Sequence, residues 1–564
     1  MNKRNLLLLT GLSLFLTNML AGDNKEGIDL FKAELYEAAK FSLLKQTGQS
    51  PFEQAENYYY LGQVYYQLGQ EDSASYYYKK SIEVLPSYPL GYVGEGKLEL
   101  SRRNIKVAEE RFKRARDFAK KDPSVHTEIA DVYVRQGDYR NAQLAIDGAR
   151  KINDKYPRIY IEEGNMLMKQ AKVGEAAARY ENALHYDKND RIAYFKLAQL
   201  YKDVSPDTAL DYLNKLIAID PNFAPAYALT GEIYMEKGMY RRAAEAYEKF
   251  TSLPGVPMLY HERNAQSLFF AEQYPRSMER IKYVLSRDPN NVVMKRLEAY
   301  NYHRMEESER GFERLSKFIE STPKERHIFQ DYTTLGQLAI KVNNTEKAIE
   351  AYNMAIELDP ERAKKENLYK EIATMAYGAN MYADAIKYFE KYFATGVTPD
   401  AGDYFAYGQA NYFSALHYFS EEYTATAKTP ETIAADEVAL KEFIRKGDEA
   451  YAEAIKLIGP SNRHIAYMGR ARINELLDTY DSSKNKKIEG HARPMYEEAL
   501  TFMLDNNSEG IRNKDILVAY YYLVKYYWAL ENRASTEEYC RKILAVDPND
   551  DLAKKILDYF KKKK

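Results

Sequence analysis

Cysteine and tryptophan are almost absent from this sequence. The 564 residues contain one of each, Cys540 and Trp528. A single thiol cannot form an internal disulfide, and it cannot supply a cysteine-based metal site. We therefore expect Cys540 to be a buried packing residue rather than a nucleophile or a ligand.

An excess of charge of either sign is lacking as well. The chain has 81 basic and 83 acidic residues, which gives a formal net charge of −2 at pH 7. Proteins that bind nucleic acid present a basic face, so this balance argues against a nucleic-acid partner. Beyond Gly22 no apolar run is long enough to cross a bilayer, so we expect no integral membrane segment in the mature chain.

Motifs that carry chemistry are missing too. The sequence has no G-x-x-x-x-G-K-[ST], no H-E-x-x-H and no G-x-S-x-G. The eight His residues are scattered, and most carboxylates fall on the exposed faces of expected helices. We expect no enzyme, no cofactor and no metal. The alternative is an enzyme, or an enzyme subunit, that acts on envelope polymer through a hidden carboxylate site on a helical solenoid.

What the sequence does contain is a pattern that returns about every 34 residues. The first clear copy begins at Ala55 and alternates bulky and small residues over two expected helices: Tyr58, Leu61, Gly62 and Tyr65, then Ala74, Tyr78 and Ser81, with Pro86 at the end. Small residues are needed where two helices cross closely, and aromatic rings fill the space beside each crossing. Proline ends the second helix because it lacks an N–H group.

About a dozen such copies resemble the tetratricopeptide repeat (TPR) family. The resemblance implies an all-α fold, a right-handed TPR superhelix (α-solenoid) of about 12–13 helix hairpins. It also implies a capping helix after Pro548, with Leu552, Ile556 and Phe560 facing inward.

The regularity of the copies divides the chain. Residues 1–22 form one segment, 23–400 a regular TPR array that opens with a truncated hairpin over Gly27–Gln46, and 401–564 irregular TPR units with insertions and the cap. The insertions span residues 414–441 and 479–490. Insertions in a solenoid often lie on its binding face, but a longer helix pair and a neutral loop are equally compatible with these two.

The first segment has the features of a secretory signal peptide. Lys3 and Arg4 precede a mostly apolar stretch, Leu6–Leu20, and the small residues Ala21 and Gly22 follow. We expect export to the periplasm, with the protein soluble there or peripheral to a membrane. An uncleaved N-terminal anchor is the alternative.

Two tripeptides resemble the short O-glycosylation motif of Bacteroidetes, Asp72-Ser73-Ala74 and Asp207-Thr208-Ala209. Both fall where a second helix should begin, so helix N-caps are the favoured interpretation. With the signal peptide, they suggest an exported bacterial, Bacteroidetes-like member of the TPR family.

The family resemblance also implies which residues line the concave groove. The first-helix positions that form this surface in TPR proteins give a partner-binding set rich in aromatic and amide side chains: Tyr59, Gln63, Tyr66, Asn165, Phe195, Phe405, Gln409, Tyr412, Phe413, Tyr521 and Trp528. Such a groove suits an extended peptide. Aromatic planes also stack on sugar rings, so carbohydrate is a weaker alternative.

The function expected from these features is a non-enzymatic protein–protein interaction scaffold of the cell envelope. Other envelope proteins would bind in the groove, and the irregular unit from Asp400 to Pro460, with Tyr412 and Phe413, is the preferred site.

Overall fold

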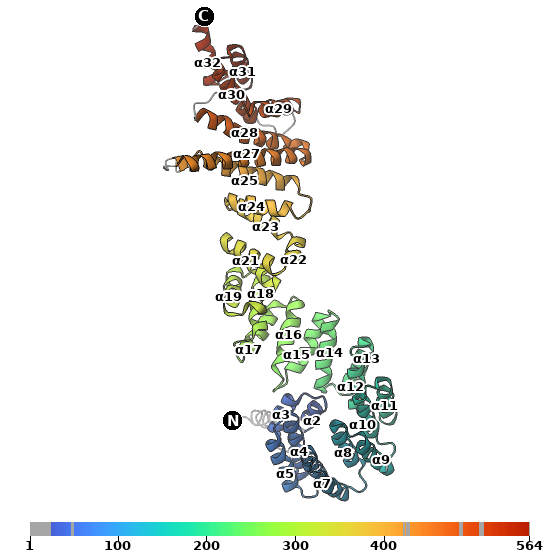
Figure 1. Cartoon of the computed structure of the whole chain (residues 1–564). Helices are drawn as coiled ribbons and strands as arrows, with labels where there is room; N and C mark the ends of the chain where they lie inside the picture. The colour runs from blue at the N-terminus through green and yellow to red at the C-terminus, as the bar shows by residue number, and fades with distance from the viewer. Residues whose placement is uncertain are drawn as a thin grey trace, which may run out of the picture. The chain divides into compact units, whose positions relative to one another are not determined.

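The computed structural model describes residues 24–46, 50–420, 423–424, 429–483, 489–506 and 513–562. Every regular element in these ranges is a helix. The chain divides into two compact units, unit 1 (Met1–Glu307) and unit 2 (Ser308–Lys564), each of which is described by itself (Figure 1). The signal-peptide prediction lies outside the described residues.

Unit 1 consists of a short helix pair followed by longer helices of similar length. Its helices are α2 (Lys25–Lys32), α3 (Tyr36–Lys45), α4 (Pro51–Gln67), α5 (Glu71–Val84), α6 (Pro89–Ser101), α7 (Ile105–Phe118), α8 (Pro123–Gln136), α9 (Tyr139–Ile152), α10 (Pro157–Lys169), α11 (Val173–Tyr186), α12 (Arg191–Tyr201), α13 (Pro206–Ile219), α14 (Ala224–Glu236), α15 (Tyr240–Thr251), α16 (Met258–Phe270), α17 (Tyr274–Leu285) and α18 (Val292–Arg304).

Unit 2 has the same hairpin arrangement with less even lengths. Its α-helices are α19 (Ser308–Ser321), α20 (Phe329–Lys341), α21 (Thr345–Leu358), α22 (Pro360–Lys365), α23 (Leu368–Gly378), α24 (Tyr382–Phe393), α25 (Ala401–His417), α27 (Pro430–Leu457), α28 (Arg463–Ser483), α29 (Arg493–Asp505), α30 (Asn513–Ala529), α31 (Arg533–Val546) and α32 (Asp551–Lys562).

Consecutive helices pack as antiparallel hairpins, from α4 with α5 through α16 with α17 in unit 1 and from α20 with α21 through α30 with α31 in unit 2. The all-α fold class, a TPR α-solenoid, is therefore confirmed. Hairpin packing follows the predicted contacts. Gly231 of α14 leaves room for the ring of Tyr247 on α15, and Gly62 of α4 does the same for Tyr78 on α5.

The tight turn inside a hairpin needs a residue in the left-handed backbone region. Gly137 ends α8 with φ +77, and its N–H bonds back to the carbonyl oxygen of Val134. Glycine adopts this conformation without steric cost, which is why it falls at this position of the repeat.

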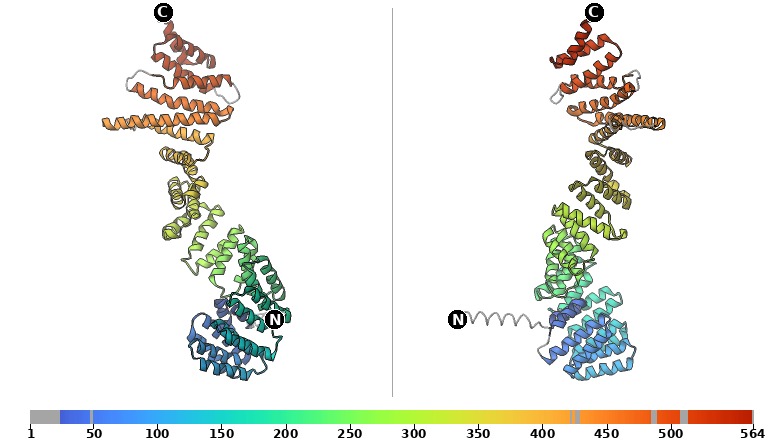
Figure 2. Two further views of the ribbon diagram at one scale, coloured as in Figure 1. Left: turned by 45° about the vertical axis from the view of Figure 1, so that its right-hand side comes forward. Right: turned by 90° about the vertical axis from the view of Figure 1, so that its left-hand side faces the viewer.

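Unit 1 also contains contacts between segments far apart in sequence. Helix α2 packs against α14, and the buried residues Leu30 and Phe31 of α2 share one apolar cluster with Tyr59 of α4 and Phe250 of α15. The views agree that the α2–α3 pair lies beside the helices of the later repeats of unit 1 (Figures 1 and 2). The truncated hairpin over Gly27–Gln46 is confirmed as helical, but it does more than open the array.

Several details differ from the sequence expectations. The short helix α22 was not predicted, and the N-caps of α5 and α13 are Gln70 and Ser205 rather than residues of the two tripeptides. The second half of the 414–441 insertion belongs to α27, which is 28 residues long, so this insertion lengthens a helix pair.

The capping helix α32 packs on α31, as expected. Its register differs from the prediction, because Ala553 is the buried residue while Leu552 is 54% exposed. Ile556 packs against the core, as predicted. The boundary at residue 400, drawn on repeat regularity, falls inside unit 2 and stays a prediction.

Candidate partner-binding surface

The predicted groove residues of unit 1 lie largely in its interior. Tyr59 is fully buried, and its hydroxyl donates to Glu128 Oε2 at 3.1 Å and accepts from Gln63 Nε2 at 2.8 Å. Gln63 in turn accepts from the Lys97 ammonium group, which also lies 4.4 Å from the centre of the Tyr66 ring. The side chains of Tyr59, Gln63, Lys97 and Tyr66 thus form one connected set of contacts inside the unit.

The α2–α3 hairpin covers part of this surface. Leu30 and Phe31 pack in the cluster of Tyr59, while Phe195 packs against Phe223 and shares a second cluster with Ala33. Tyr59, Gln63 and Phe195 are each 4% exposed or less. The sequence interpretation of these three as exposed anchors is therefore corrected, because in this structure they offer no surface to another chain.

Lys97 is the most unusual member of this network. It is 1% exposed, and burial lowers the pKa of its ammonium group to about 7, although Asp131 and Glu128 nearby oppose that shift. A lysine with so low a pKa carries a cost when it is charged inside the fold. Inside the fold its amino group is held between the Gln63 side chain and the Tyr66 ring.

We expect the Lys97→Met variant to change how the stability of unit 1 depends on pH. The pKa of Lys97 is about 7 in the fold against 10.5 for the ordinary group. Between these values the unfolded chain binds a proton that the fold does not, so wild-type stability should rise with pH by up to about 1.4 kcal/mol per unit. The variant lacks this slope, and its stability relative to wild type should fall from pH 7 to pH 9.5.

Urea unfolding, monitored by hydrogen exchange in α4 and α6, measures how stability depends on pH. Lys113→Met is the matched control, because Lys113 is exposed on α7. Equal slopes for wild type and Lys97→Met would contradict the assignment.

Asn165 is half-buried and lines a pocket of unit 1. It accepts from the Tyr180 hydroxyl at 3.0 Å and donates to Glu162 at 3.0 Å. The pocket beside it is lined by charged residues of both signs, including Glu34, Asp131, Arg135, Lys169 and Lys196. Glu34 comes from the turn between α2 and α3, so the chain's own hairpin forms one wall.

In unit 2 the predicted residues of α25 remain half-exposed. Phe405, Gln409, Tyr412 and Phe413 follow the helical spacing that puts them on one face, opposite Tyr407. This row is ordered by its neighbours. Phe405 packs on Tyr451 of α27, and Phe413 stacks on Tyr382 of α24 with 4.8 Å between the ring centres. The Gln409 side-chain oxygen accepts a hydrogen bond from the Tyr377 hydroxyl of α23.

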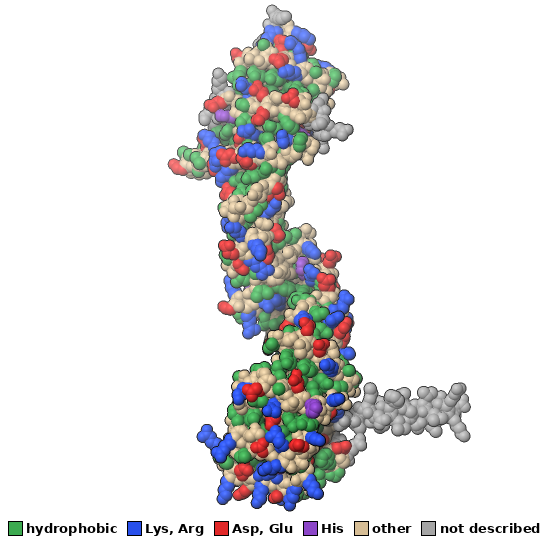
Figure 3. Space-filling view, turned by 90° about the vertical axis from the view of Figure 1, so that its right-hand side faces the viewer, with side chains coloured by type: hydrophobic (Ala, Val, Ile, Leu, Met, Phe, Trp, Pro, Cys, Tyr) green, Lys and Arg blue, Asp and Glu red, His purple; other side chains and the backbone are tan. Residues whose placement is uncertain are grey.

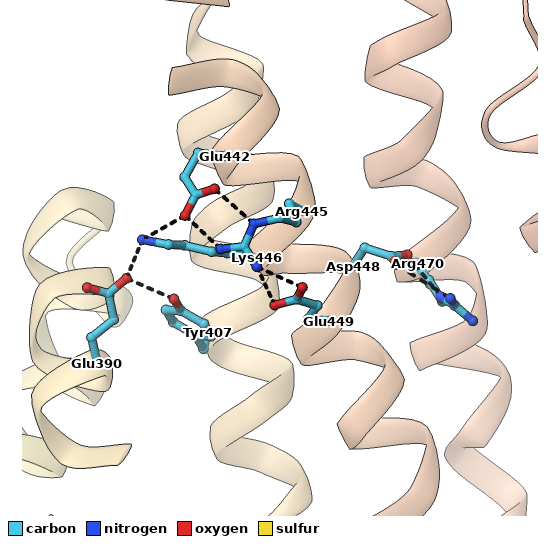
Figure 4. A network of polar contacts seen from close by, with 8 residues as sticks. All are labelled: Glu390, Tyr407, Glu442, Arg445, Lys446, Asp448, Glu449 and Arg470. Carbon is cyan, nitrogen blue, oxygen red and sulfur yellow. Dashed lines mark hydrogen bonds and ion pairs between the residues drawn. The ribbon is translucent and has the colours of Figure 1, made fainter. Parts of the chain in front are cut away.

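The opposite side of α25 is fixed by a polar network centred on α27 (Figure 4). Glu390 of α24 accepts from Lys446 at 2.7 Å and from the Tyr407 hydroxyl at 3.0 Å. Farther along α27, Asp448 pairs with Arg470 of α28 at 2.9 Å. Each exposed pair contributes little to stability, but together they define how α24, α25, α27 and α28 align.

The last two predicted residues lie on α30. The Tyr521 hydroxyl donates to Asp550, which raises the pKa of Tyr521 to about 12. Trp528 is 42% exposed and packs against Tyr559 and Phe560 of α32. Cys540 is fully buried, as predicted, and burial raises the pKa of its thiol to about 11.

The described part of the chain holds no group of three or more His, Cys, Asp or Glu placed for a metal ion. No helix within the described ranges is both long and apolar enough to cross a bilayer. On the face that Figure 3 displays, basic and acidic side chains are interspersed.

Comparison with known families agrees with the hairpins. Models described as tetratricopeptide repeat match residues 55–88, 161–224, 224–255 and 332–362. The chain carries tetratricopeptide repeats. The matched segments fall on α4–α5, α10–α13, α14–α15 and α20–α21. Proteins with such repeats generally mediate protein–protein interaction, and the scaffold itself is typically non-enzymatic.

Two curated proteins are similar over limited stretches. Protein O-mannosyl-transferase TMTC1 of Homo sapiens is 20% identical over 211 residues, 37% of this chain and 23% of that protein. Small glutamine-rich tetratricopeptide repeat-containing protein 2 of Mycosarcoma maydis is 31% identical over 88 residues, 15% of this chain and 25% of that protein. The chain thus spans about a quarter of each relative's length.

Among solved structures, the C-terminal part of a TPR repeat-containing protein from Cytophaga hutchinsonii is 20% identical. The match covers 52% of this chain and 99% of that one, with a TM-score of 0.32. A tetratricopeptide repeat protein from Parabacteroides merdae is also 20% identical over 43% of this chain and 96% of that one, with a TM-score of 0.28.

Sequence reasoning missed the residues that fill the unit 1 groove. Asp29, Glu34 and Phe41 belong to the truncated hairpin, which the repeat pattern identified only as the start of the array. No local signal marks them, because their partners Arg191, Lys196 and Gly255 lie more than 150 residues away.

Proposed function

We propose that this protein is a non-enzymatic scaffold of the cell envelope that binds segments of other envelope proteins along unit 2. The observation that carries the proposal is the row of half-exposed groove residues on α25. Three of its side chains are aromatic: Phe405 and Phe413 pack on rings of neighbouring helices, and Tyr412 packs against a buried cluster of α27 and α28. Rigid aromatic anchors lose little side-chain entropy on binding, which makes them effective contact residues.

The location is part of the proposal. The amino-acid sequence of residues 1–22 supports export to the periplasm, with the protein soluble there or peripheral to a membrane. Fractionation should recover the mature chain with the envelope, whereas full-length protein in the cytosol would contradict this part. The alternative of an enzyme acting on envelope polymer, and that of a carbohydrate ligand, gain no support from the described residues.

We expect the double variant Tyr412→Ala and Phe413→Ala to capture its partner at least about 30-fold more weakly, because one lost aromatic anchor often costs about 2 kcal/mol. The measurement is a quantitative pull-down from envelope extract with purified wild type and variant. Proteins are scored as partners when they are lost with the double variant and retained with Tyr76→Ala. Tyr76 is a 55% exposed aromatic on the second helix of its hairpin, outside the groove.

The double variant needs a check of its fold, because the structure places both residues closer to the core than the sequence suggested. Tyr412 packs against the buried cluster that includes Tyr451 and Ile473, and Phe413 stacks on Tyr382. Phe413→Ala alone is the milder second variant. Equal capture by all variants at unchanged helicity would contradict α25 as the site.

A further inference from the structure

The concave side of unit 1 is occupied by the chain itself. Asn24, just before α2, donates to the backbone oxygen of Glu53 on α4 at 2.7 Å. At the other side of the unit, Lys25 pairs at 2.6 Å with Asp220, which precedes α14. The α2–α3 hairpin therefore bridges the first regular repeat and the later repeats of unit 1, which Figure 1 shows side by side.

The bridge is polar where it meets the later repeats. Arg191 of α12 contacts both Asp29 of α2 and Asp220, the latter at 2.9 Å. Lys196 lies 3.9 Å from Glu34. Burial raises the pKa of Asp29 in spite of Arg191, so the charge on this carboxylate is held in the fold at a cost. Buried ion pairs contribute less net stability than apolar packing of the same area.

The two helices of the hairpin pack closely on each other. A Cβ atom on Gly27 of α2 would lie 2.5 Å from the Leu43 side chain of α3, so the two helices pack in close contact. Their lengths are 8 and 10 residues. Isolated helices this short are not stable in water, so the hairpin holds its shape through its contacts with the other helices of unit 1.

We propose that the α2–α3 hairpin is a displaceable internal ligand of unit 1, and that the surface it leaves when it opens accepts an amphipathic helical segment of the same charge pattern. That segment offers aliphatic and aromatic side chains to Tyr60 and to the cluster that contains Phe250, an acidic group to Arg191 and a basic group to Asp220. The hairpin thereby acts as an autoinhibitory contact on this surface. The proposal concerns unit 1 only and is independent of the proposed site on α25.

The test uses the full chain with Asp29→Lys, which places a cation against Arg191 and changes no residue of the surface that the hairpin covers. Hydrogen exchange in α2 and α3 should become at least about tenfold faster, while exchange in α8 to α11 stays unchanged, because local openings do not require global unfolding. Asp72→Lys is the matched control, the same charge reversal at an exposed site on α5. Asp29→Asn is a milder variant, should the reversal disturb folding.

A fluorescent peptide of residues 24–46 then probes the vacated surface in trans. It should bind the Asp29→Lys chain at least about tenfold more tightly than wild type or Asp72→Lys, since only the first has an open surface. The same peptide carrying Asp29→Lys should not bind. Loosening of α8 to α11 together with the hairpin would show that the hairpin is a fixed part of the unit and would overturn the proposal. Failure of the peptide to bind an opened chain would overturn it as well.

Discussion

Replacing Asp478 by Ala should destabilise unit 2 by about 3–5 kcal/mol, because several hydrogen bonds to one buried charged acceptor are lost together. Asp478 of α28 is 3% exposed. Its carboxylate accepts from the backbone N–H groups of Gly490, His491 and Ala492 at 3.0, 2.8 and 3.1 Å. It also accepts from the Tyr522 hydroxyl of α30 at 2.5 Å. The variant leaves four donors without this acceptor.

The position of these donors explains the size of the effect. Ala492 is the N-cap of α29 and has no side-chain acceptor, so Asp478 caps the helix from a neighbouring helix. A carboxylate at a helix N-terminus also interacts favourably with the helix dipole. Burial and the adjacent carboxylate raise the pKa of Tyr522, which keeps its hydroxyl a donor.

The measurement is urea unfolding with hydrogen exchange of α28 to α30 as the readout. Asp505→Ala, an exposed aspartate at the end of α29, is the control and should change stability by less than about 0.5 kcal/mol. A cost below about 1 kcal/mol for Asp478→Ala would mean that water replaces the carboxylate as acceptor.

Gly231→Leu should destabilise unit 1 by about 3 kcal/mol, at the upper end of the cost of overpacking, or more. A Cβ at Gly231 would lie 2.6 Å from Cε1 and 2.7 Å from Cδ1 of Tyr247. Tyr247 is 1% exposed, so its ring has no free volume into which it could move. Helices α14 and α15 would have to separate.

Unfolding in urea, read by hydrogen exchange of α14 and α15, gives this cost. Gly174→Ala is the control. Gly174 has no heavy atom within 4 Å of its added Cβ and lies in α11, so alanine should stabilise by up to about 1 kcal/mol. Adding Tyr247→Ala to Gly231→Leu should recover part of the loss, and no recovery would argue against a direct clash.

The repeat period predicted the hairpins because their packing is local. Gly231 and Tyr247 are 16 residues apart, and the same offset joins Gly62 with Tyr78. Each contact is encoded in one copy of the repeat, so the order of helices and most of the core could be read from spacing alone. The fully buried Cys540 followed from the same register.

The exposure of a predicted site residue could be foreseen only where its surroundings are the adjacent repeats alone. The row from Phe405 to Phe413 depends on adjacent helices, and the structure leaves it half-exposed. Tyr59 is buried among rings of its own hairpin and the next one and donates to Glu128, which lies 69 residues away. Phe195 shares a buried cluster with Ala33, which ends α2. No single copy of the repeat encodes these contacts, and the ion pair of Arg191 with Asp29 spans 162 residues.

The contact of α2 with α14 has a consequence for how unit 1 folds. In an open array of repeats, stability is the sum of each unit and its nearest neighbours, and unfolding can begin at a free end. A bridge between residues 195 apart, such as Lys25 and Asp220, joins the first helix to the later repeats and raises the contact order. While the hairpin is closed, fraying at the first regular repeat also breaks contacts with α14, so α2 couples the first and the later repeats of unit 1 in a way that a linear array of the same hairpins lacks.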